Sequence, residues 1–456
     1  MTRRSLLLAL LAPKRPPNVI LILTDDQGYG DLSCYGAKDI RTPHIDQLAK
    51  EGMRFTDFYA APICSPSRAA LMTGCYPMRV GIPKVLNSNS PNGIRDSEKL
   101  LPEILKEKGY ATAIFGKWHL GDRPQHNPLR HGFDEYFGTP GSNDMGSNMD
   151  LAARQAGKAG VALIEGEKQI ETDPDQAQLS HRYTQRAIQF MERNRHKPFF
   201  LYLPHNMPHT PIFATAPFHG KSGRGLYGDV VQEVDDTVGE LMAAVKRLNL
   251  DQDTLVIFSS DNGPWLIFGD HGGSPEPLRG GKREVLEGGF RVPAIFRYKG
   301  KIPAGRVCRE MASNMDILPT IAKLAGGTLP AHPIDGRDIW PLLEGRKDAR
   351  TPHEAFFYYY QDELRAVRSG KWKLILPHTD EAVPDPAKVG MGGKRGGVKS
   401  VTYQQALYNL EADPKETKDL AAQNPDIVIK LAALAETMRS DLGDSITHRK
   451  GARTRS

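Results

Sequence analysis

Four short, mainly apolar runs without polar alternation recur along the chain. They are residues 19–23, 112–115, 199–203 and 254–258. A continuous apolar run of this length is typical of a strand that is buried on both faces of a parallel sheet. A polar cluster follows each run directly, so we expect four strands whose carboxyl ends all carry polar side chains.

Segments with helical spacing of apolar residues lie between these runs. One begins at Pro43 and ends before Gly52, with Ile45 and Leu48 on one face. Further helices are expected at residues 98–108, 180–194, 230–248 and 315–324. Strands that alternate with helices predict an open α/β sheet, in which ligands bind at the carboxyl ends of the strands.

The pattern changes after about residue 340. An aromatic run at residues 356–360 precedes residues 365–376, where apolar and polar positions alternate as in a half-exposed antiparallel sheet. We therefore predict a large α/β domain over residues 18–345, which carries the polar strand ends, and a smaller C-terminal α+β domain over residues 346–447, around a short antiparallel sheet. Residues 384–399 are expected to form a mobile loop, and residues 448–456 a frayed tail.

The N-terminus has the pattern of an export signal. A basic head at Arg3 and Arg4 precedes a short apolar run that ends at Ala12, and residues 13–17 have the composition of a linker. We expect a periplasmic or secreted protein, although a cytoplasmic location stays open because a clean cleavage site is missing. No later stretch is long and apolar enough to span a bilayer, so no membrane span is expected.

Composition excludes several classes of protein. Hydrophobic residues at 39% and charged residues at 25% exclude disordered and fibrous chains. The formal charge of +6 helps to attract an anionic substrate. The sequence lacks a dense basic run with interleaved aromatic residues, so it does not predict a protein that binds nucleic acid. Four scattered cysteines are too few for a disulfide framework, and the oligomeric state stays open.

Two pairs of hard oxygen ligands follow two of the predicted strands. Asp25 and Asp26 follow the first, and Asp261 and Asn262 follow the last. Each pair alone is typical of a turn or a helix cap. Two pairs at matching strand ends instead predict a Ca²⁺ or Mg²⁺ site, because crowded carboxylates repel one another unless a cation neutralises them.

Cys64 lies where a helix is expected to begin. Ser65 is its predicted N-cap, Pro66 its first residue and Gly74 its end. Free amides and the helix dipole there favour an anion and lower the pKa of a thiol. The alternative is a buried structural cysteine.

Basic and imidazole side chains accompany these acidic clusters. Each alone is typical of a surface cation or a satisfied histidine, but together they predict a clamp for a tetrahedral oxyanion. The group consists of Lys117, His119, His205, His209, Lys282 and Arg291.

The segments that carry these residues resemble the type I sulfatase family. Residues 64–68 and 71–74 are similar to its signature, and residues 25–30, 116–121, 261–263 and 287–293 are similar to its other motifs, in family order. Within the family, residues 131–134 and 142–144 look closest to arylsulfatase A and N-acetylgalactosamine-6-sulfatase.

The resemblance implies an alkaline-phosphatase-like fold, with a large mixed sheet flanked by helices. It also implies that a formylglycine-generating enzyme converts Cys64 to Cα-formylglycine, whose hydrate supplies the nucleophilic oxygen. Ca²⁺ is implied rather than Mg²⁺. Its implied ligands are Asp25, Asp26, the formylglycine at position 64, Asp261 and Asn262.

The resemblance also implies roles for the remaining residues. Arg68 would support the diol, Lys117, Lys282 and Ser142 would hold the sulfate, and His119 would act as a base toward the diol. His209 is the implied proton donor to the leaving group; Lys282 could share this task, and His205 is the competing candidate. Arg291 is expected on the substrate side of the clamp.

The expected substrate is a sulfate ester, preferably of a carbohydrate. Two rivals stay open. One is a phosphatase or phosphonate monoester hydrolase of the same superfamily, because all tetrahedral oxyanions suit one clamp. The other is a non-catalytic protein that binds sulfated glycans.

Overall fold

The computed structural model describes residues 15–146, 160–383 and 390–455. The predicted export signal lies almost wholly outside the described residues, and so do residues 384–389 of the predicted loop. Within the described ranges, no helix is long and apolar enough to cross a membrane.

A ten-stranded mixed sheet forms the centre of the molecule, in the order β11-β2-β10-β9-β1-β8-β4-β5-β6-β7. The four runs predicted from the sequence are β1 (Asn18–Thr24), β4 (Ala111–Phe115), β8 (Phe199–Pro204) and β9 (Thr254–Ser260). They are neighbours in the order β9-β1-β8-β4, and all three pairings are parallel. The predicted buried parallel strands are confirmed, since every residue of all four is buried.

Antiparallel strands at both sides make the sheet mixed. On one side β10 (Ala294–Tyr298) is antiparallel to β9 and to β2 (Met53–Phe55), which pairs with β11 (Arg306–Cys308). On the other side are β5 (Glu135–Gly138), β6 (Ala162–Glu165) and β7 (Lys168–Thr172). A separate pair, β3 (Phe58–Tyr59) and β12 (Ala312–Ser313), lies outside this sheet.

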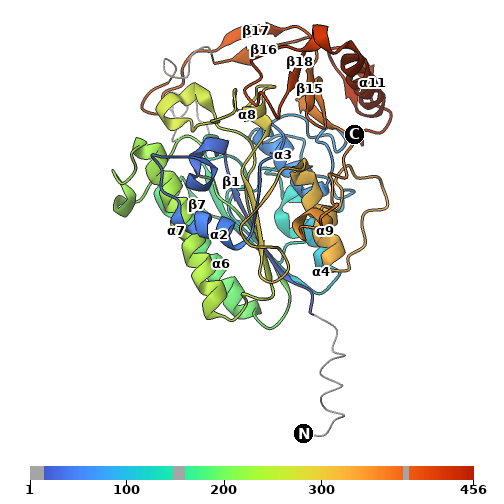
Figure 1. Ribbon diagram of the computed structural model, residues 1–456. Helices are drawn as coiled ribbons and strands as arrows, with labels where there is room; N and C mark the ends of the chain where they lie inside the picture. The colour runs from blue at the N-terminus through green and yellow to red at the C-terminus, as the bar shows by residue number, and fades with distance from the viewer. Residues whose placement is uncertain (1–14, 147–159, 384–389, 456) are drawn as a thin grey trace, which may run out of the picture.

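Helices cover both faces of the large sheet (Figure 1). One face packs against α2 (Pro43–Glu51), α6 (Leu179–Asn194) and α7 (Gly225–Arg247), and the other against α3 (Cys64–Thr73), α4 (Leu101–Lys106) and α9 (Ile317–Leu324). Strand β1 shows why both faces are covered. Its residues Ile20 and Ile22 enter one core, while Val19 and Leu21 enter the other, because successive side chains point to opposite faces.

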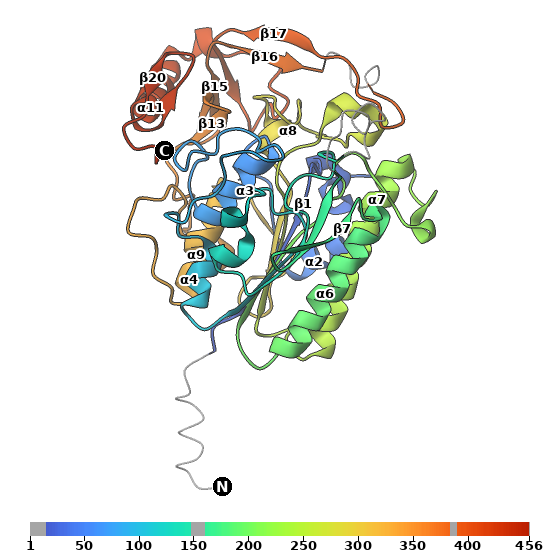
Figure 2. The same ribbon diagram turned by 180° about the vertical axis from the view of Figure 1, so that it is seen from behind.

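The C-terminal domain is built on a four-stranded antiparallel sheet, as the alternating pattern predicts. Its order is β13 (Phe356–Tyr360), β14 (Glu363–Ser369), β15 (Trp372–Ile375) and β18 (Ala406–Asn409). Helix α11 (Pro425–Leu442) packs on it, and the ribbon of β16 (His378–Ala382) and β17 (Lys399–Tyr403) is separate. Figure 2 shows these elements across the same end of the large sheet as α8 (Glu287–Phe290). The remaining short elements are α10 (Trp340–Leu343), β19 (Gly443–Asp444) and β20 (Arg449–Lys450).

The end of the chain differs from the frayed tail that we expected. Strand β20 pairs with β19, and the Arg455 guanidinium forms an ion pair with the buried carboxylate of Glu98, Nε to Oε1 at 2.7 Å. The backbone amide of Arg455 also donates to the carbonyl of Arg79 at 2.6 Å. A composition rich in arginine predicted solvation, but these arginines have partners that only the folded chain provides.

A buried charge cluster fastens the C-terminal sheet to the large domain. The ammonium of Lys373 on β15 lies 3.0 Å from Oε1 of Glu287 on α8 and 2.8 Å from Oε1 of Glu416. Glu287 also accepts hydrogen bonds from the hydroxyls of Tyr59 and Tyr358, at 2.6 and 2.7 Å. Since all three ionic groups are fully buried, none of them can exchange its partner for water.

Replacing Lys373 by Met should therefore destabilise the C-terminal domain. The change leaves two buried carboxylates without their cation, and we expect a loss of about 3–5 kcal/mol in the free energy of unfolding. Urea unfolding followed by tryptophan fluorescence measures it. The control is K371M on the exposed neighbouring lysine, expected to change the free energy by less than about 0.5 kcal/mol. Equal unfolding midpoints for both variants would contradict the role of this cluster.

Candidate active site

The polar clusters predicted from the sequence meet at one edge of the sheet. Because β9, β1, β8 and β4 are parallel neighbours, the loops that follow them leave the sheet on the same side. Helix α3 begins against this edge with Cys64, two residues earlier than predicted, and Ile63 rather than Ser65 is its N-cap.

Three buried carboxylates form the centre of the site. Asp25 and Asp26 leave β1, and Asp261 leaves β9, where Thr24 and Ser260 lie in register. The amide of Asp26 donates to Oδ1 of Asp261 at 3.2 Å, and Asp26 has a φ of 63°, in the left-handed region that non-glycine residues seldom adopt. The close approach of the two strand ends thus brings these acidic groups together.

Three buried cations from separate segments compensate them. Arg68 on α3 lies 3.2 Å from Oδ2 of Asp25 and 2.8 Å from Oδ2 of Asp261. Lys117 after β4 pairs with Asp25. Lys282 lies 2.7 Å from Oδ1 of Asp26. Burial alone would raise the pKa of Asp25, but Lys117 and the other cations bring it well below its usual value.

The donor set fits a divalent cation. Ligand atoms of Asp25, Asp26, Cys64 and His209 all lie within 4.8 Å of one another. Burial, followed by the charge of Asp25, raises the pKa of Asp261 to about 7, so the three cations leave this carboxyl under-compensated. Oδ1 of Asn262 is buried and has no hydrogen-bond partner among the described residues. A divalent cation at this position would supply both the missing charge and a partner for this oxygen. The sequence did not predict His209 as a member of this group of possible metal ligands.

Cys64 lies between the carboxylates and the lysines. Its Sγ is 3.5 Å from Oδ1 of Asp25, and Nζ of Lys282 donates to it at 3.2 Å. The predicted fall in the pKa of this thiol is wrong: burial raises it well above its usual value, and Lys117 and Lys282 offset only part of that rise. The unmodified side chain is therefore a neutral thiol rather than a thiolate nucleophile.

Two of the predicted histidines lie at the cluster. Nε2 of His119 lies 3.2 Å from the carbonyl oxygen of Leu86, and its buried Nδ1 has no partner among the described residues. Nδ1 of His209 lies 2.6 Å from the carbonyl oxygen of Thr210, and its Nε2 lies 3.5 Å from Oδ2 of Asp26. Burial first, then a neighbouring lysine, lowers the pKa of both imidazoles, so both are neutral at pH 7.

Ser142 also reaches the site, while two other predicted residues do not. Nζ of Lys117 donates to Oγ of Ser142 at 3.0 Å. His205 instead points to α7, where its Nε2 lies 3.4 Å from Oγ1 of Thr237. Arg291 pairs with Asp57 at 3.2 Å, in the buried cluster that holds the C-terminal sheet. Both side chains contact other parts of the fold, so the structure does not place His205 or Arg291 at the carboxylate cluster, where they were expected to bind substrate.

Two residues at the site were not predicted. The Trp265 ring lies 4.2 Å from Nζ of Lys282 and 5.4 Å from the ring of His209, centroid to centroid. Asp144 is partly buried, and although burial opposes ionisation, His209 and Ser142 lower its pKa. The only signal in the sequence was proximity: Trp265 follows the cluster at Asp261, and Asp144 follows Ser142.

Comparison with known proteins identifies the family. Residues 17–327 match the sulfatase family, and residues 351–451 match the C-terminal region of aryl-sulfatase. The chain belongs to the sulfatase family. It is 43% identical over 376 residues to N-acetylgalactosamine-6-sulfatase of Homo sapiens. This alignment covers 79% of this chain and 71% of that protein. It is 39% identical over 479 residues to arylsulfatase A of Homo sapiens, with 97% and 92% covered.

A solved structure agrees over most of the chain. The crystal structure of Ps i-CgsB in complex with k-i-k-neocarrahexaose is 32% identical to this sulfatase, with a TM-score of 0.78 and 93% of each chain covered. The alkaline-phosphatase-like α/β fold expected from the sequence is thereby confirmed, together with the small antiparallel sheet at the C-terminus.

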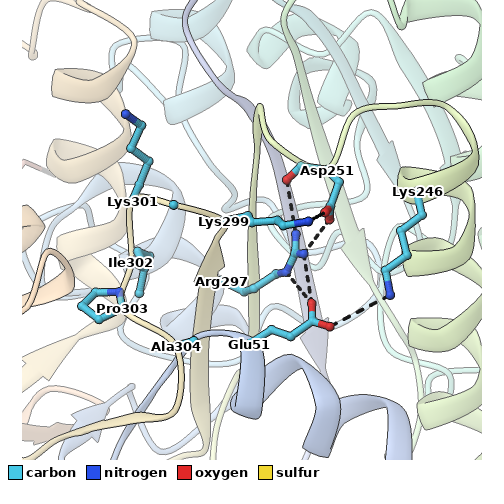
Figure 3. A pocket seen from close by; sticks show the side chains of 10 residues that line it. Glu51, Lys246, Asp251, Arg297, Lys299, Lys301, Ile302, Pro303 and Ala304 are labelled. Carbon is cyan, nitrogen blue, oxygen red and sulfur yellow. Dashed lines mark hydrogen bonds and ion pairs between the residues drawn. The ribbon is translucent and has the colours of Figure 1, made fainter.

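A pocket of about 580 Å³ adjoins the site of this sulfatase through Lys282 and Trp265. Its other wall is the β16–β17 ribbon of the C-terminal domain, with Asp380 and Ser400. A pocket of about 670 Å³ lies at the opposite edge of the sheet, before β9, where Arg297 and Lys299 are already paired with acidic residues (Figure 3). Of these two pockets, the one beside Lys282 adjoins the cluster of carboxylates and cations.

Chelation tests the cation site. Removing divalent cations should lower the melting temperature of this sulfatase, and adding Ca²⁺ should restore it, because a ligand that binds only the folded state stabilises it by about 4 kcal/mol at a thousand times its dissociation constant. Differential scanning calorimetry measures the shift. The D261N variant, with one anionic ligand fewer, should need more Ca²⁺ for the same shift. Identical Ca²⁺ titrations for both proteins would count against this site.

Glu284, in the wall of the pocket, should make stability depend on pH. Burial, followed by the charge of Asp380, raises the pKa of Glu284 to about 8. The folded protein then holds a proton that the unfolded chain releases near pH 4.5, so the stability linked to this proton is lost as pH rises from about 5 to 9. E284Q removes this loss. Melting temperatures should therefore diverge with rising pH, the variant being more stable at pH 9. Parallel curves would refute the shift.

Proposed function

We propose that this sulfatase hydrolyses sulfate esters of carbohydrates through a formylglycine derived from Cys64, at a Ca²⁺ site. The observation that carries the proposal is the position of Cys64. Its Sγ lies 3.5 Å from a carboxylate oxygen of the cation site and 3.2 Å from the ammonium of Lys282. An oxygen nucleophile at this position would face both a metal and the cations that receive the sulfate.

The unmodified Cys64 thiol is a poor nucleophile in this site, and conversion to formylglycine would replace it with an oxygen nucleophile. The thiol is neutral, whereas hydrated formylglycine would supply two hydroxyls. One would attack the sulfur and displace the alcohol, and proton loss from the other would then expel sulfate and restore the aldehyde. The Cys64 side chain is only 2% exposed. A formylglycine-generating enzyme would therefore act on it before the chain has folded.

The oxygen-rich donor set favours Ca²⁺ over Mg²⁺. Asp25, Asp26, Asp261 and Asn262 would hold the ion together with the residue at position 64. Ca²⁺ accepts many protein oxygens in irregular geometry, whereas Mg²⁺ keeps several waters, for which this buried cluster is unsuited. The ion would polarise the sulfuryl group.

The cations around Cys64 would bind and orient the sulfate ester. Lys117 is paired with Asp25, and Lys282 is paired with Asp26. Lys117 also donates a hydrogen bond to Oγ of Ser142 at 3.0 Å. These groups are fixed before substrate arrives, so they stabilise developing charge on the sulfuryl oxygens without rearranging. Arg68 holds two carboxylates and the carbonyl of Lys117, at 2.7 Å, and thereby fixes the geometry of the site.

The two histidines would move protons at different atoms. Nδ1 of His119 has no partner among the described residues and its ring is neutral, so it would accept the proton of the second diol hydroxyl, whose loss expels sulfate and restores the aldehyde. Nδ1 of His209 donates to the Thr210 carbonyl, which leaves Nε2 as the atom that exchanges protons. The negative charge of a bound sulfate ester raises the pKa of His209, and its imidazolium can then protonate the leaving oxygen, a task that Lys282 can share.

A carbohydrate substrate is supported by the relatives and by the pocket. One relative is named for N-acetylgalactosamine 6-sulfate, and one solved structure holds a neocarrahexaose. The pocket of about 580 Å³ beside Lys282 lies within the range of small-molecule sites. Export through the basic and apolar N-terminal segment is also part of this proposal.

A phosphatase or phosphonate monoester hydrolase is the second candidate, because its substrates suit the same clamp. A two-metal phosphatase needs a second set of ligands, and the described residues contain one cluster of this kind. The cysteine at the centre of the cluster favours sulfate.

Turnover of an aryl sulfate and an aryl phosphate tests the proposal, with the wild type and C64A produced in a host that makes formylglycine. Sulfate hydrolysis should dominate, and C64A should lose at least about three orders of magnitude in kcat, because the nucleophile is removed. Circular dichroism should show the same fold for both proteins.

Three results would overturn the proposal. They are faster phosphate than sulfate turnover, undiminished activity of C64A, and an unmodified Cys64 in the tryptic peptide of an active sample, seen by mass spectrometry. A protein that only binds sulfated glycans would show no turnover in either form.

A further inference from the structure

Arg283 is held in the pocket wall by an unusual backbone conformation. Its φ is 77°, in the left-handed region, and its amide donates to the Pro62 carbonyl at 2.9 Å. Such a conformation in a non-glycine residue persists only where its surroundings impose it. The guanidinium carbon lies 5.2 Å from the centre of the Trp265 ring. This contact with Trp265 places the side chain of Arg283 at the lining of the pocket.

The charge of Arg283 has no anionic partner among the described residues. Its Nε is buried and makes no hydrogen bond to any described residue, and no ion pair includes its guanidinium in the described part of the chain. A buried donor without an acceptor is unfavourable by about 1–3 kcal/mol, so this atom is suited to an acceptor that comes from outside the protein.

A second arginine enters the same pocket from the C-terminal domain. Arg395 lies on a segment that is fixed to η8 (Leu266–His271), where the amides of Gly390 and Gly396 donate to the carbonyl of Ile267 at 3.1 and 2.9 Å. Its side chain lines the pocket and forms no ion pair within the described ranges. Two guanidinium groups from distant segments therefore face one space.

The other charged groups of the pocket are largely compensated. Arg365 pairs with Asp380 at 2.8 Å, and Lys282 pairs with Asp26. The raised pKa of Glu284, about 8, keeps its carboxyl mostly neutral at pH 7. One exposed carboxylate, Glu381, remains against the two free arginines, so the pocket has an excess of positive charge.

We propose that this pocket binds a second anionic group of the substrate, a sulfate or a carboxylate on the sugar next to the ester that is cleaved. Arg283 and Arg395 would be its ligands, and Trp265 would support the sugar ring between the two anions. The proposal rests on the proposed carbohydrate substrate. Since Lys282 both faces Cys64 and lines the pocket, one molecule can reach the nucleophile and the two arginines together. Guanidinium groups suit this task because their planar forks bind such anions through two hydrogen bonds.

Inhibition of aryl sulfate hydrolysis tests this site in the full-length modified enzyme. Three oligosaccharides of equal length would compete with the aryl sulfate: one with a single sulfate, one with a second sulfate on the neighbouring sugar, and one with a carboxylate there. The wild type should bind either doubly anionic competitor at least about tenfold more tightly than the singly sulfated one, because charged hydrogen bonds are added.

The R283Q and R395Q variants should each reduce this preference by about tenfold. The matched control is K394Q, which removes an exposed neighbouring charge that does not line the pocket, and it should keep both the preference and the turnover of aryl sulfate. Melting temperatures check that the variants fold. Because Arg395 is exposed, R395Q also covers the case in which R283Q does not fold.

Equal inhibition by all three competitors in the wild type would overturn the proposal, and so would an unchanged preference in both arginine variants. A difference between the sulfate and carboxylate competitors identifies the anion that the site prefers. The proposed function has its own test. It is refuted if the aryl sulfate is not hydrolysed or if no sulfated carbohydrate is cleaved. If only the carbohydrate is not cleaved, the inhibition constants still decide whether the pocket binds a second anion.

Discussion

The crowding of three buried carboxylates at the ends of β1 and β9 is the constraint on which the site depends. Asp25, Asp26 and Asp261 meet because these strands are parallel neighbours in register. Like charges in a buried place need compensation. Arg68 on α3, Lys117 after β4 and Lys282 before α8 supply part of it. Segments far apart in the chain must therefore be in place before the site exists.

The same principle joins the two domains. Lys373 on the C-terminal sheet lies between Glu287 and Glu416, and Glu287 belongs to the helix that follows the Lys282 loop. The C-terminal domain thus holds the loop that carries Lys282 and Arg283. It also supplies the opposite wall of the pocket. The C-terminal domain therefore supports both the loop at the site and the pocket proposed to select the substrate.

The sequence predicted much of the site, and its errors have a common cause. The strand-end clusters, the helix at Cys64 and the C-terminal antiparallel sheet follow from local patterns, and the structure contains all three. His205 and His209 lie in one loop, yet only His209 faces the carboxylates, while Thr237 on α7 binds the other. The pKa of the Cys64 thiol was predicted from the helix end alone, whereas burial dominates it. Local patterns do not reveal which partner a side chain will meet.

By itself the sequence determined the four buried strands, the acidic and basic groups at their ends, and the family, because strand periodicity and short motifs are local properties of the chain. Only the tertiary structure decided that Arg291 belongs to the domain junction and that Arg283, Arg395 and Trp265 line one pocket. The physical reason is distance along the chain. A charge acquires its partner, or lacks one, through the packing of segments more than a hundred residues apart.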